Sequence, residues 1–399
     1  MPSIRRSSML IGLGVSFAAS SAPADDWPCF RGPQHDGICR ESSLKTGLPG
    51  DAKPRWQRDV GSAFSSFAVV DGRLFTCGTE NKQQVLLCLD AETGAVLWQQ
   101  PIEKEYRDNF GDGTRATPTV DDGRVYIMGG HGRVLCCNAE TGSEIWNQTF
   151  DHKPQWGYSG SILVEDGLAI FSAGKSDGAL RAVRKTTGKL AWTCDNDMPG
   201  YATPLPFDFG GRRFVCGFAA NRAVIADLKT GKKRLSIPWQ TDWKINAAAP
   251  IFHDGMLFLN SGYHTGCGLF KLERKRKQLD AQEVWRSAAL LNKFQSALLV
   301  DDTLYASDEK ALKAVDFRSG EELWSQPRVA NGTLVLADGR LWLLTEKGEL
   351  QVGPPSRADF KPIAKAPLLD GRCWTVPVIS GGRLFVRNLE TVKCYDVRL

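Results

Sequence analysis

Two groups of residues in this sequence could carry chemistry: a pair of adjacent cysteines, and aromatic, basic and amide side chains spread over several loops. Cys136 and Cys137 lie on a predicted strand, where neighbouring side chains point to opposite faces. Because free cysteines are often buried, we interpret this pair as small core residues. No catalytic residue is predicted.

The residues that usually hold metals or phosphates have no suitable spacing. The chain has five histidines, and none forms a ligand pattern such as HExxH. A C-x-x-C pair is absent, and so is a Gly-rich phosphate loop opening a helix. We therefore expect no metal, no nucleotide and no cofactor.

Several loops place aromatic rings beside Arg, Lys, Asn or Gln, which a site for a polar ligand or a peptide would need. The alternative is that the same side chains fill the centre of the fold without binding anything. The candidate ligand-binding residues are Arg115, Trp156, Tyr158, Tyr201, Trp243, Lys244, Asn246, Asn292 and Gln295.

The elements that must position these loops come from an internal repeat. The stretch 89–98, Leu-Asp-Ala-Glu-Thr-Gly-Ala-Val-Leu-Trp, recurs at 137–146 and more weakly at 186–192 and 316–324. Gly allows a tight turn, and the Trp that follows can be buried against the neighbouring repeat. The predicted docking tryptophans are Trp56, Trp98, Trp146, Trp192, Trp285 and Trp324.

A second turn marks each repeat. Dipeptides such as Asp71-Gly72 and Asp122-Gly123 stand between apolar runs and recur every 37 to 51 residues, eight times along the chain. They are strong hairpin signals, and the spacing is typical of four-stranded propeller blades. The eighth repeat supplies only three strands, and residues 54–60 around Trp56 form an unpaired strand near the start. We therefore predict an all-β, eight-bladed propeller closed by pairing this N-terminal strand with the last blade.

The N-terminus predicts export. Arg5 and Arg6 precede a short apolar run and a small-residue cleavage site, so residues 1–24 read as a signal peptide. We expect residues 25–399 to form one propeller, with a loop-rich segment at 25–53, located in the periplasm or secreted as a monomer. No transmembrane segment is predicted.

Charge and cysteine content limit the remaining possibilities. The net charge of +5 is too small to indicate nucleic-acid binding, and we interpret the basic run 271–277 as a solvated loop. Eleven cysteines in an exported protein permit disulfides, and Cys29 with Cys39 is the preferred pair. Cys77 with Cys88, and Cys373 with Cys394, could also face each other across strands.

The Asp-x-x-Thr-Gly-x-x-x-Trp pattern and the Trp27-Pro28-x-Phe30-Arg31-Gly32-Pro33 opening resemble the PQQ-like β-propeller repeat family, most closely its exported planctomycete members. That superfamily includes the outer-membrane assembly lipoprotein BamB and the quinoprotein dehydrogenases. The resemblance implies the propeller fold over nearly the whole mature chain. It leaves function open, because propellers host both enzymes and scaffolds.

Two functions follow from the resemblance. The preferred one is a non-catalytic binding or scaffold module for protein or polysaccharide partners, with envelope assembly as a BamB-like version. The alternative is a PQQ-dependent oxidoreductase acting on alcohols or sugars, which would need PQQ with Ca²⁺ and, by resemblance, a disulfide between Cys136 and Cys137. No cluster of Glu, Asn and Asp is found for the Ca²⁺ site.

Overall fold

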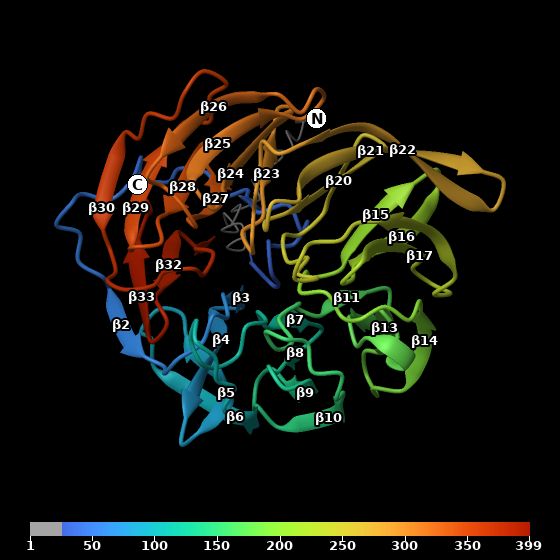
Figure 1. The fold of residues 1–399 in the computed structure, drawn as a ribbon. Coiled ribbons are helices and arrows are strands. Elements are labelled where there is room, and N and C mark those ends of the chain that lie inside the picture. Colours follow the sequence, from blue (N-terminus) through green and yellow to red (C-terminus); the bar gives the residue numbers. More distant parts are fainter. Residues whose placement is uncertain (1–25) are drawn as a thin grey trace, which may run out of the picture.

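Eight β-sheets surround a central axis in the computed structural model, which describes residues 26–399 (Figure 1). Within the described chain, each sheet contains four antiparallel strands that follow one another in sequence from the axis outward, except where the termini contribute. The predicted eight-bladed, all-β propeller is confirmed. The predicted signal peptide, residues 1–24, lies outside the described residues.

Blades 1 to 4 take their strands in chain order, and blade 3 also contains the 3-10 turn η1 (Lys175–Asp177). The strands are β3 (Ala68–Val70), β4 (Arg73–Glu80), β5 (Gln83–Asp90), β6 (Val96–Lys104); β7 (Thr119–Asp121), β8 (Arg124–Met128), β9 (Arg133–Asn138), β10 (Glu144–Thr149); β11 (Leu163–Glu165), β12 (Leu168–Phe171), β13 (Leu180–Arg184), β14 (Leu190–Cys194); and β15 (Leu205–Phe209), β16 (Arg212–Phe218), β17 (Arg222–Asp227), β18 (Lys233–Pro238).

Blades 5 and 6 repeat this order, whereas blades 7 and 8 each gain a strand from the N-terminal segment. The strands are β19 (Ile251–His253), β20 (Met256–Ser261), β21 (Gly266–Lys275), β22 (Gln278–Ser287); β23 (Leu298–Val300), β24 (Thr303–Ser307), β25 (Ala311–Asp316), β26 (Glu322–Pro327); β27 (Thr333–Ala337), β28 (Arg340–Leu344), β29 (Glu349–Gly353), β30 (Ala364–Pro367) with β1 (Ile38–Cys39); and β31 (Val378–Ser380), β32 (Arg383–Arg387), β33 (Thr391–Asp396) with β2 (Trp56–Asp59).

The hairpin between the first two strands of each blade is set by local sequence. In blade 1, Val70 pairs with Arg73, so Asp71 and Gly72 form the two-residue turn. Their φ angles are 50° and 72°, as a type I′ turn requires. Asp and Gly reach this left-handed region at low cost, which explains why the dipeptide recurs.

A β-bulge just before the docking position recurs in blades 1 to 6. In blade 1, Cys88 pairs with Trp98 and Leu89 pairs with Val96, so Leu97 is an extra residue without a partner. Leu97 is 47 % exposed for this reason. The same register shift stands before Trp146, Trp192, Leu235, Trp285 and Trp324. Bulges increase local twist, and in blade 1 the extra residue falls on the solvent face.

Each docking tryptophan packs on the turn of the following blade. The indole N–H of Trp192, in blade 3, donates to the Leu228 carbonyl in blade 4 at 3.0 Å. A Cβ placed on Gly231 would lie only 2.5 Å from this ring, so the turn requires glycine at this position. We call such a turn, together with the tryptophan that packs on it, a tryptophan seat. Equivalent bonds of 2.9–3.1 Å are made by Trp56, Trp98, Trp146, Trp285 and Trp324.

The ring closes where the sequence predicted. Strand β2 pairs antiparallel with β33, with Trp56 opposite Cys394, and the two lie side by side in Figure 1. Trp56 then docks on the turn of blade 1 through the Ala91 carbonyl. Apolar clusters lie between neighbouring blades, and the one at this closure joins side chains of blades 1, 7 and 8.

Two sequence expectations about loops were incomplete. Residues 271–277 are not a loop: they extend β21 and the turn into β22, a hairpin that projects from the ring in Figure 1. Only Leu272 of this run is buried, and residues 273–277 are all exposed, so the tip of the hairpin is solvated on both faces. The loop-rich segment 25–53 contains β1, which pairs in parallel with β27.

Candidate binding site in the central channel

The loops that lead into the innermost strands enclose a cavity of about 580 Å³ at the channel axis. Each blade supplies the residue seven positions before its first hairpin turn, and all eight of these residues line the cavity. They are Phe64, Arg115, Ser159, Thr203, Ala247, Phe294, Asn331 and Trp374. Cavities of roughly 300–1,000 Å³ are usual for small-molecule sites.

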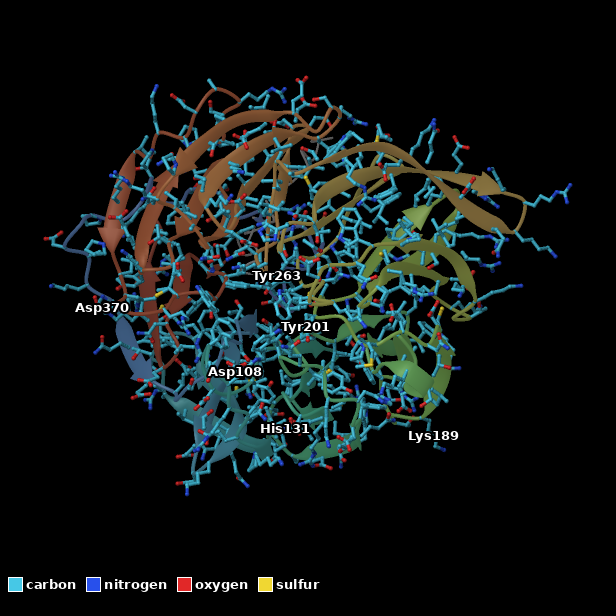
Figure 2. The ribbon with its side chains drawn as sticks, viewed as in Figure 1. Asp108, His131, Lys189, Tyr201, Tyr263 and Asp370 are labelled. Carbon is cyan, nitrogen blue, oxygen red and sulfur yellow. The ribbon has the colours of Figure 1, made fainter. Side chains whose placement is uncertain are left out.

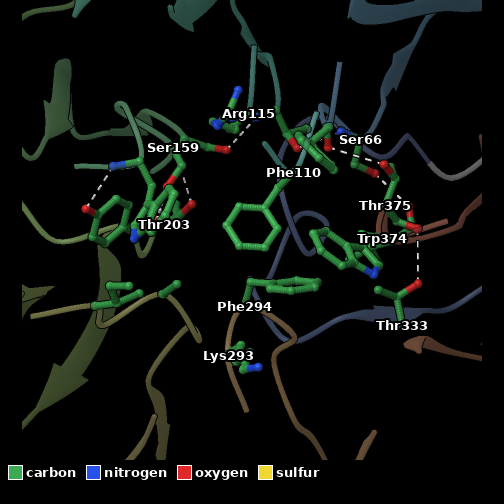
Figure 3. A pocket seen from close by; sticks show the side chains of 18 of the residues that line it. Ser66, Phe110, Arg115, Ser159, Thr203, Lys293, Phe294, Thr333, Trp374 and Thr375 are labelled. Carbon is green, nitrogen blue, oxygen red and sulfur yellow. Dashed lines mark hydrogen bonds between the residues drawn. The ribbon is translucent and has the colours of Figure 1, made fainter. Parts of the chain in front are cut away.

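Aromatic rings form one wall around Trp374. Its ring lies 4.6 Å from that of Phe294 and 5.7 Å, stacked at 20°, from that of Phe64. Phe110 lies at the centre of the view in Figure 3, with its ring 5.1 Å from that of Trp156 and 6.1 Å from that of Trp374. These rings together give one side of the cavity an apolar lining that a ring-shaped ligand could contact.

Arg115 is the principal charge of the site. Its guanidinium makes an ion pair with Asp108 and stacks 4.2 Å from the centre of the Tyr106 ring. Burial lowers the pKa of Arg115, and the neighbouring Asp108 carboxylate opposes that shift. Asp108 is thus already engaged, and the pair carries no net charge toward a ligand.

Two other cations surround the mouth. The Lys293 ammonium lies 3.6 Å from the Glu309 carboxylate and over the Tyr263 ring. The Arg372 guanidinium lies 4.5 Å from the centre of the Trp374 ring and donates to the Phe110 carbonyl, which ties that loop to blade 8. Arg372 therefore helps to hold the aromatic wall in place, whereas Lys293 is engaged by Glu309 and Tyr263.

A belt of hydroxyl groups from Ser66, Thr117, Ser161 and Thr203 lines another part of the cavity. The backbone N–H of Ser66 donates to the Thr117 hydroxyl at 3.1 Å, that of Thr117 to Ser161 at 2.9 Å, and that of Ser161 to the Thr203 hydroxyl at 3.0 Å. The hydroxyls of Thr117, Ser161 and Thr203 each accept a hydrogen bond from a backbone N–H of the preceding blade, and each keeps its own O–H for donation. The belt joins blades 1 to 4 and offers donors to a ligand.

The predicted site residues divide into two groups. Four of them line the cavity, namely Arg115, Trp156, Tyr201 and Trp243. Figure 2 places Tyr201 near the centre of the ring with Tyr263 and Asp108, far from the peripheral Lys189. The Tyr201 hydroxyl accepts the Trp156 backbone N–H at 3.3 Å, and burial raises the pKa of Tyr201 to about 12.

The other predicted residues lie outside the cavity. Tyr158, Asn246 and Asn292 are buried among backbone groups: Tyr158 donates to the Ala173 carbonyl, and Asn246 to three carbonyls. Gln295 borders a small void beneath the cavity, and Lys244 is exposed. Their polar groups serve the loops rather than a ligand, because buried amides must be satisfied within the fold.

Six aromatic residues of the site were not among the predicted ones: Phe30, Phe64, Phe110, Tyr263, Phe294 and Trp374. Three of them, Phe64, Phe294 and Trp374, stand seven residues before a hairpin turn, in the loops of blades 1, 6 and 8. That constant offset from the turn was the available signal. Phe30 comes from the N-terminal segment, for which the repeat offers no equivalent position.

The residues present do not match a PQQ–Ca²⁺ site. Within residues 26–399, no group of three or more His, Cys, Asp or Glu is arranged to hold a metal ion. The cavity lining contains one carboxylate, Asp108, and Arg115 neutralises it. Calcium needs six to eight oxygen ligands, usually several of them anionic. Cys136 and Cys137 lie in the buried strand β9, where burial raises the pKa of both thiols to about 12.

The predicted disulfide between Cys29 and Cys39 is not found: all eleven cysteines are buried, and no two of them form a disulfide in the described part of the chain. The Cys29 thiol donates to the Gly32 carbonyl at 3.1 Å within its own turn. Cys39 lies in β1, which pairs with β27 of blade 7, and its side chain packs in the apolar cluster that joins blades 1, 7 and 8. Cys77 and Cys88 are not opposite each other either, since Cys77 pairs with Leu86 and Cys88 with Phe75.

Comparison with known structures shows the same fold at low identity. BamB from Moraxella catarrhalis is 14% identical with a TM-score of 0.63, over 86% of this chain and 99% of that one. Quinohemoprotein alcohol dehydrogenase from Comamonas testosteroni gives 14% and 0.65, over 93% and 80%. A europium-containing methanol dehydrogenase gives 13% and 0.67, over 91% and 89%. These likenesses concern the fold alone.

Other comparisons complete this picture. No curated protein matches the sequence. Among the described residues, no helix has the length and apolar character needed to cross a membrane. A family model described as outer membrane protein assembly factor BamB matches residues 81–326, most of the blades and the larger part of the chain. The chain therefore belongs to this BamB-type family of PQQ-like β-propellers.

Proposed function

We propose that this protein is an exported, non-catalytic propeller that binds a polysaccharide partner in the cavity at the mouth of its channel. The observation that carries the proposal is that the aromatic wall of Trp374, Phe294, Phe64 and Phe110 lines the same cavity as the belt of hydroxyls. A sugar ring has an apolar C–H face and a rim of hydroxyls, so this lining offers a partner to each of them.

The charges of the site support a neutral ligand. Arg115 is paired with Asp108, and Lys293 with Glu309, so a free anion would gain little from either cation. A neutral polyol needs hydrogen-bond partners and an apolar platform rather than a net charge. The site supplies both through its rings and its hydroxyl groups.

An oxidoreductase is the second candidate. It is favoured by the likeness of the fold to two alcohol-oxidising enzymes and by a cavity large enough for a flat cofactor. The single neutralised carboxylate of the lining opposes it, since no Ca²⁺ ligand set is available there. A protein partner, as the family description would suggest, is the remaining alternative.

The decisive experiment is calorimetric titration of the purified protein with neutral oligosaccharides: α-1,4-glucans, β-1,4-glucans and β-1,4-N-acetylglucosamine oligomers. We expect one series to bind and Trp374→Ala to weaken that binding at least tenfold. Leu190→Ala, a 55 % exposed residue on the outer strand β14, should bind as the parent protein does. Absence of binding by all three series would overturn the proposal.

A parallel titration with PQQ plus Ca²⁺ separates the second candidate. Stoichiometric binding of PQQ, with reduction of a dye when an alcohol is added, would show an enzyme and overturn the non-catalytic proposal.

The proposal also includes export and a monomeric state. Mass spectrometry of the protein recovered from the periplasm or medium should give a chain starting near Asp25, and light scattering should give the mass of a monomer.

A further inference from the structure

The N-terminal segment closes one end of the channel. Trp27 exchanges two backbone hydrogen bonds of 2.8 Å with Val69 on the innermost strand of blade 1, and the Pro28 carbonyl accepts from Val120 in blade 2. Trp27 is 3 % exposed, so this end of the segment is held by packing as well as by hydrogen bonds. The chain then enters the axis at Phe30, which lines the cavity.

Arg31 fastens the segment across the ring. Its side chain is 6 % exposed and donates to the carbonyls of His35, Asp36 and Ala297, the last on blade 6, at 2.8–3.1 Å. The Gly37 carbonyl accepts from Leu336, and β1 continues along blade 7. The segment thus bridges blades 1, 2, 6 and 7 beneath the cavity.

The space between the cavity and this bridge is small. It contains a void of about 10 Å³ bordered by Arg31, Gly37 and Gln295, which is room for about one water molecule. The opposite side is open, because Phe110 and Trp243 at the rim are 44 % and 58 % exposed. The cavity is therefore blind: it has an aromatic mouth and a floor made by Phe30.

From this geometry we propose that the cavity recognises the terminal residues of a glycan chain and cannot accommodate the middle of one. This inference rests on the proposed function and adds which part of the polymer is bound. A polymer passing through needs two openings, whereas a blind cavity admits a chain only by its end. Phe30 and Phe110 then limit how many sugar units can enter.

The test compares ligands that differ only in their ends. Linear α-1,4-glucose hexamer is titrated against the cyclic hexamer, which has no end. Oligomers of two to eight units from the three series are measured as well. Each is compared with a form whose non-reducing end is blocked by 4-O-methylation and with a form whose reducing end is reduced to the alditol. We expect affinity to level off after the first few units, and the cyclic form or one capped form to bind at least tenfold more weakly.

The outcomes separate this inference from the function it rests on. If capped and cyclic oligomers bind as well as free linear ones, or if affinity keeps rising with length, end recognition is wrong while saccharide binding stands. If no oligomer binds, both are wrong.

A variant tests the floor directly. Phe30→Ala deepens the cavity, so it should weaken binding of the shortest oligomers at least threefold and move the levelling-off to a longer chain. Leu190→Ala should change neither. Thermal unfolding of Phe30→Ala provides the folding control, because Phe30 is only partly buried whereas its neighbour Trp27 is in the core. An unchanged length profile in a folded Phe30→Ala protein would contradict the inference.

Discussion

The tryptophan seats on the outer part of the ring and the cavity at its centre are built from the same repeat, yet they differ in how much they vary. Six seats share one geometry, an indole N–H 2.9–3.1 Å from a turn carbonyl. The eight positions seven residues before the hairpin turns carry eight side chains with almost no repetition, from Ala247 to Trp374.

The difference follows from what each position touches. A docking tryptophan contacts the turn of the next blade, so the same side chain serves at six of the eight interfaces. A cavity position faces open space and the seven other blades, and the fold places few demands on its identity. The side chains at these positions can therefore vary to suit a ligand, as is common for loops on a rigid scaffold.

The seats also show how the ring tolerates a missing tryptophan. Blade 4 has Leu235 at the docking position, and the bulged residue before it, Arg234, donates to the Lys277 carbonyl of blade 5 at 2.9 Å. The basic hairpin of blade 5 takes the place of the glycine turn. Here a different donor and a different acceptor preserve the bond between blades.

Removing a seat should give the largest effect on stability. Trp192→Ala deletes a ring that is 8 % exposed and leaves the Leu228 carbonyl without its donor. We expect a loss of about 3–5 kcal/mol in the free energy of unfolding. Trp243→Ala removes a ring that is 58 % exposed at the channel mouth and should change stability by about 0.5 kcal/mol or less. Equal losses in guanidinium unfolding would erase the distinction between the two regions.

The glycine beneath the same seat provides a finer test. Gly231→Ala places a Cβ 2.5 Å from the Trp192 ring, whereas Gly211→Ala, in the same blade, meets no atom within 4 Å. Both glycines have φ near 70°, so each variant costs about 1–2 kcal/mol for the backbone. Gly231→Ala should lose about 1–3 kcal/mol more through overcrowding.

A double-mutant cycle isolates that crowding. In the Trp192→Ala background the extra loss at Gly231 should disappear and leave only the backbone cost, because the ring it would strike is gone. If the excess persists without the ring, the seat does not depend on close contact between tryptophan and glycine.

Asn246 tests the inner region, since it was predicted to bind a ligand and instead lies buried. It donates to the Ala219, Ala220 and Trp239 carbonyls and accepts from the Ser261 hydroxyl at 2.8 Å. Asn246→Ala should cost about 1–3 kcal/mol of stability by leaving these groups unpaired. Oligosaccharide affinity of the folded variant should stay within a factor of two. A tenfold loss of affinity with unchanged stability would mean that Asn246 contributes to ligand binding after all.

The smallest expected effect concerns acid stability of a repeat turn. Although burial raises the pKa of the Asp316 carboxyl, hydrogen bonds from Arg357 and from Ser319 hold it below its ordinary value. A carboxyl with a lowered folded-state pKa stabilises the protein above its unfolded pKa, near 4, and this contribution is lost as the pH falls through the folded-state value.

Asp316→Asn should therefore reduce the loss of stability between pH 5 and pH 2.5, measured from denaturant midpoints. Blade 2 already carries Asn138 at this position, where it accepts the same turn N–H groups at 2.9 Å, so the substitution keeps the geometry. Asp242→Asn, at an exposed rim position, serves as control. An unchanged acid profile for Asp316→Asn would mean that this turn does not contribute.

The sequence by itself determined the architecture of this protein. The Asp71-Gly72 type of dipeptide sets a turn through its own φ preferences, and the Thr-Gly turn with its tryptophan sets the distance between blades. Both signals are local and repeated, so their number fixes the number of blades. The closing strand around Trp56 follows from the strand that the eighth repeat lacks.

Only the tertiary structure decided which polar and aromatic residues share the cavity. Asn246 and Trp243 are three residues apart, yet one is buried beneath the loop and the other lines the mouth. The direction of a side chain in an irregular loop depends on contacts with other blades, which local sequence does not contain. The same reason separates Cys29 from Cys39 and places Phe30 on the floor, because the path of the N-terminal segment is set by edges of blades far away in the chain.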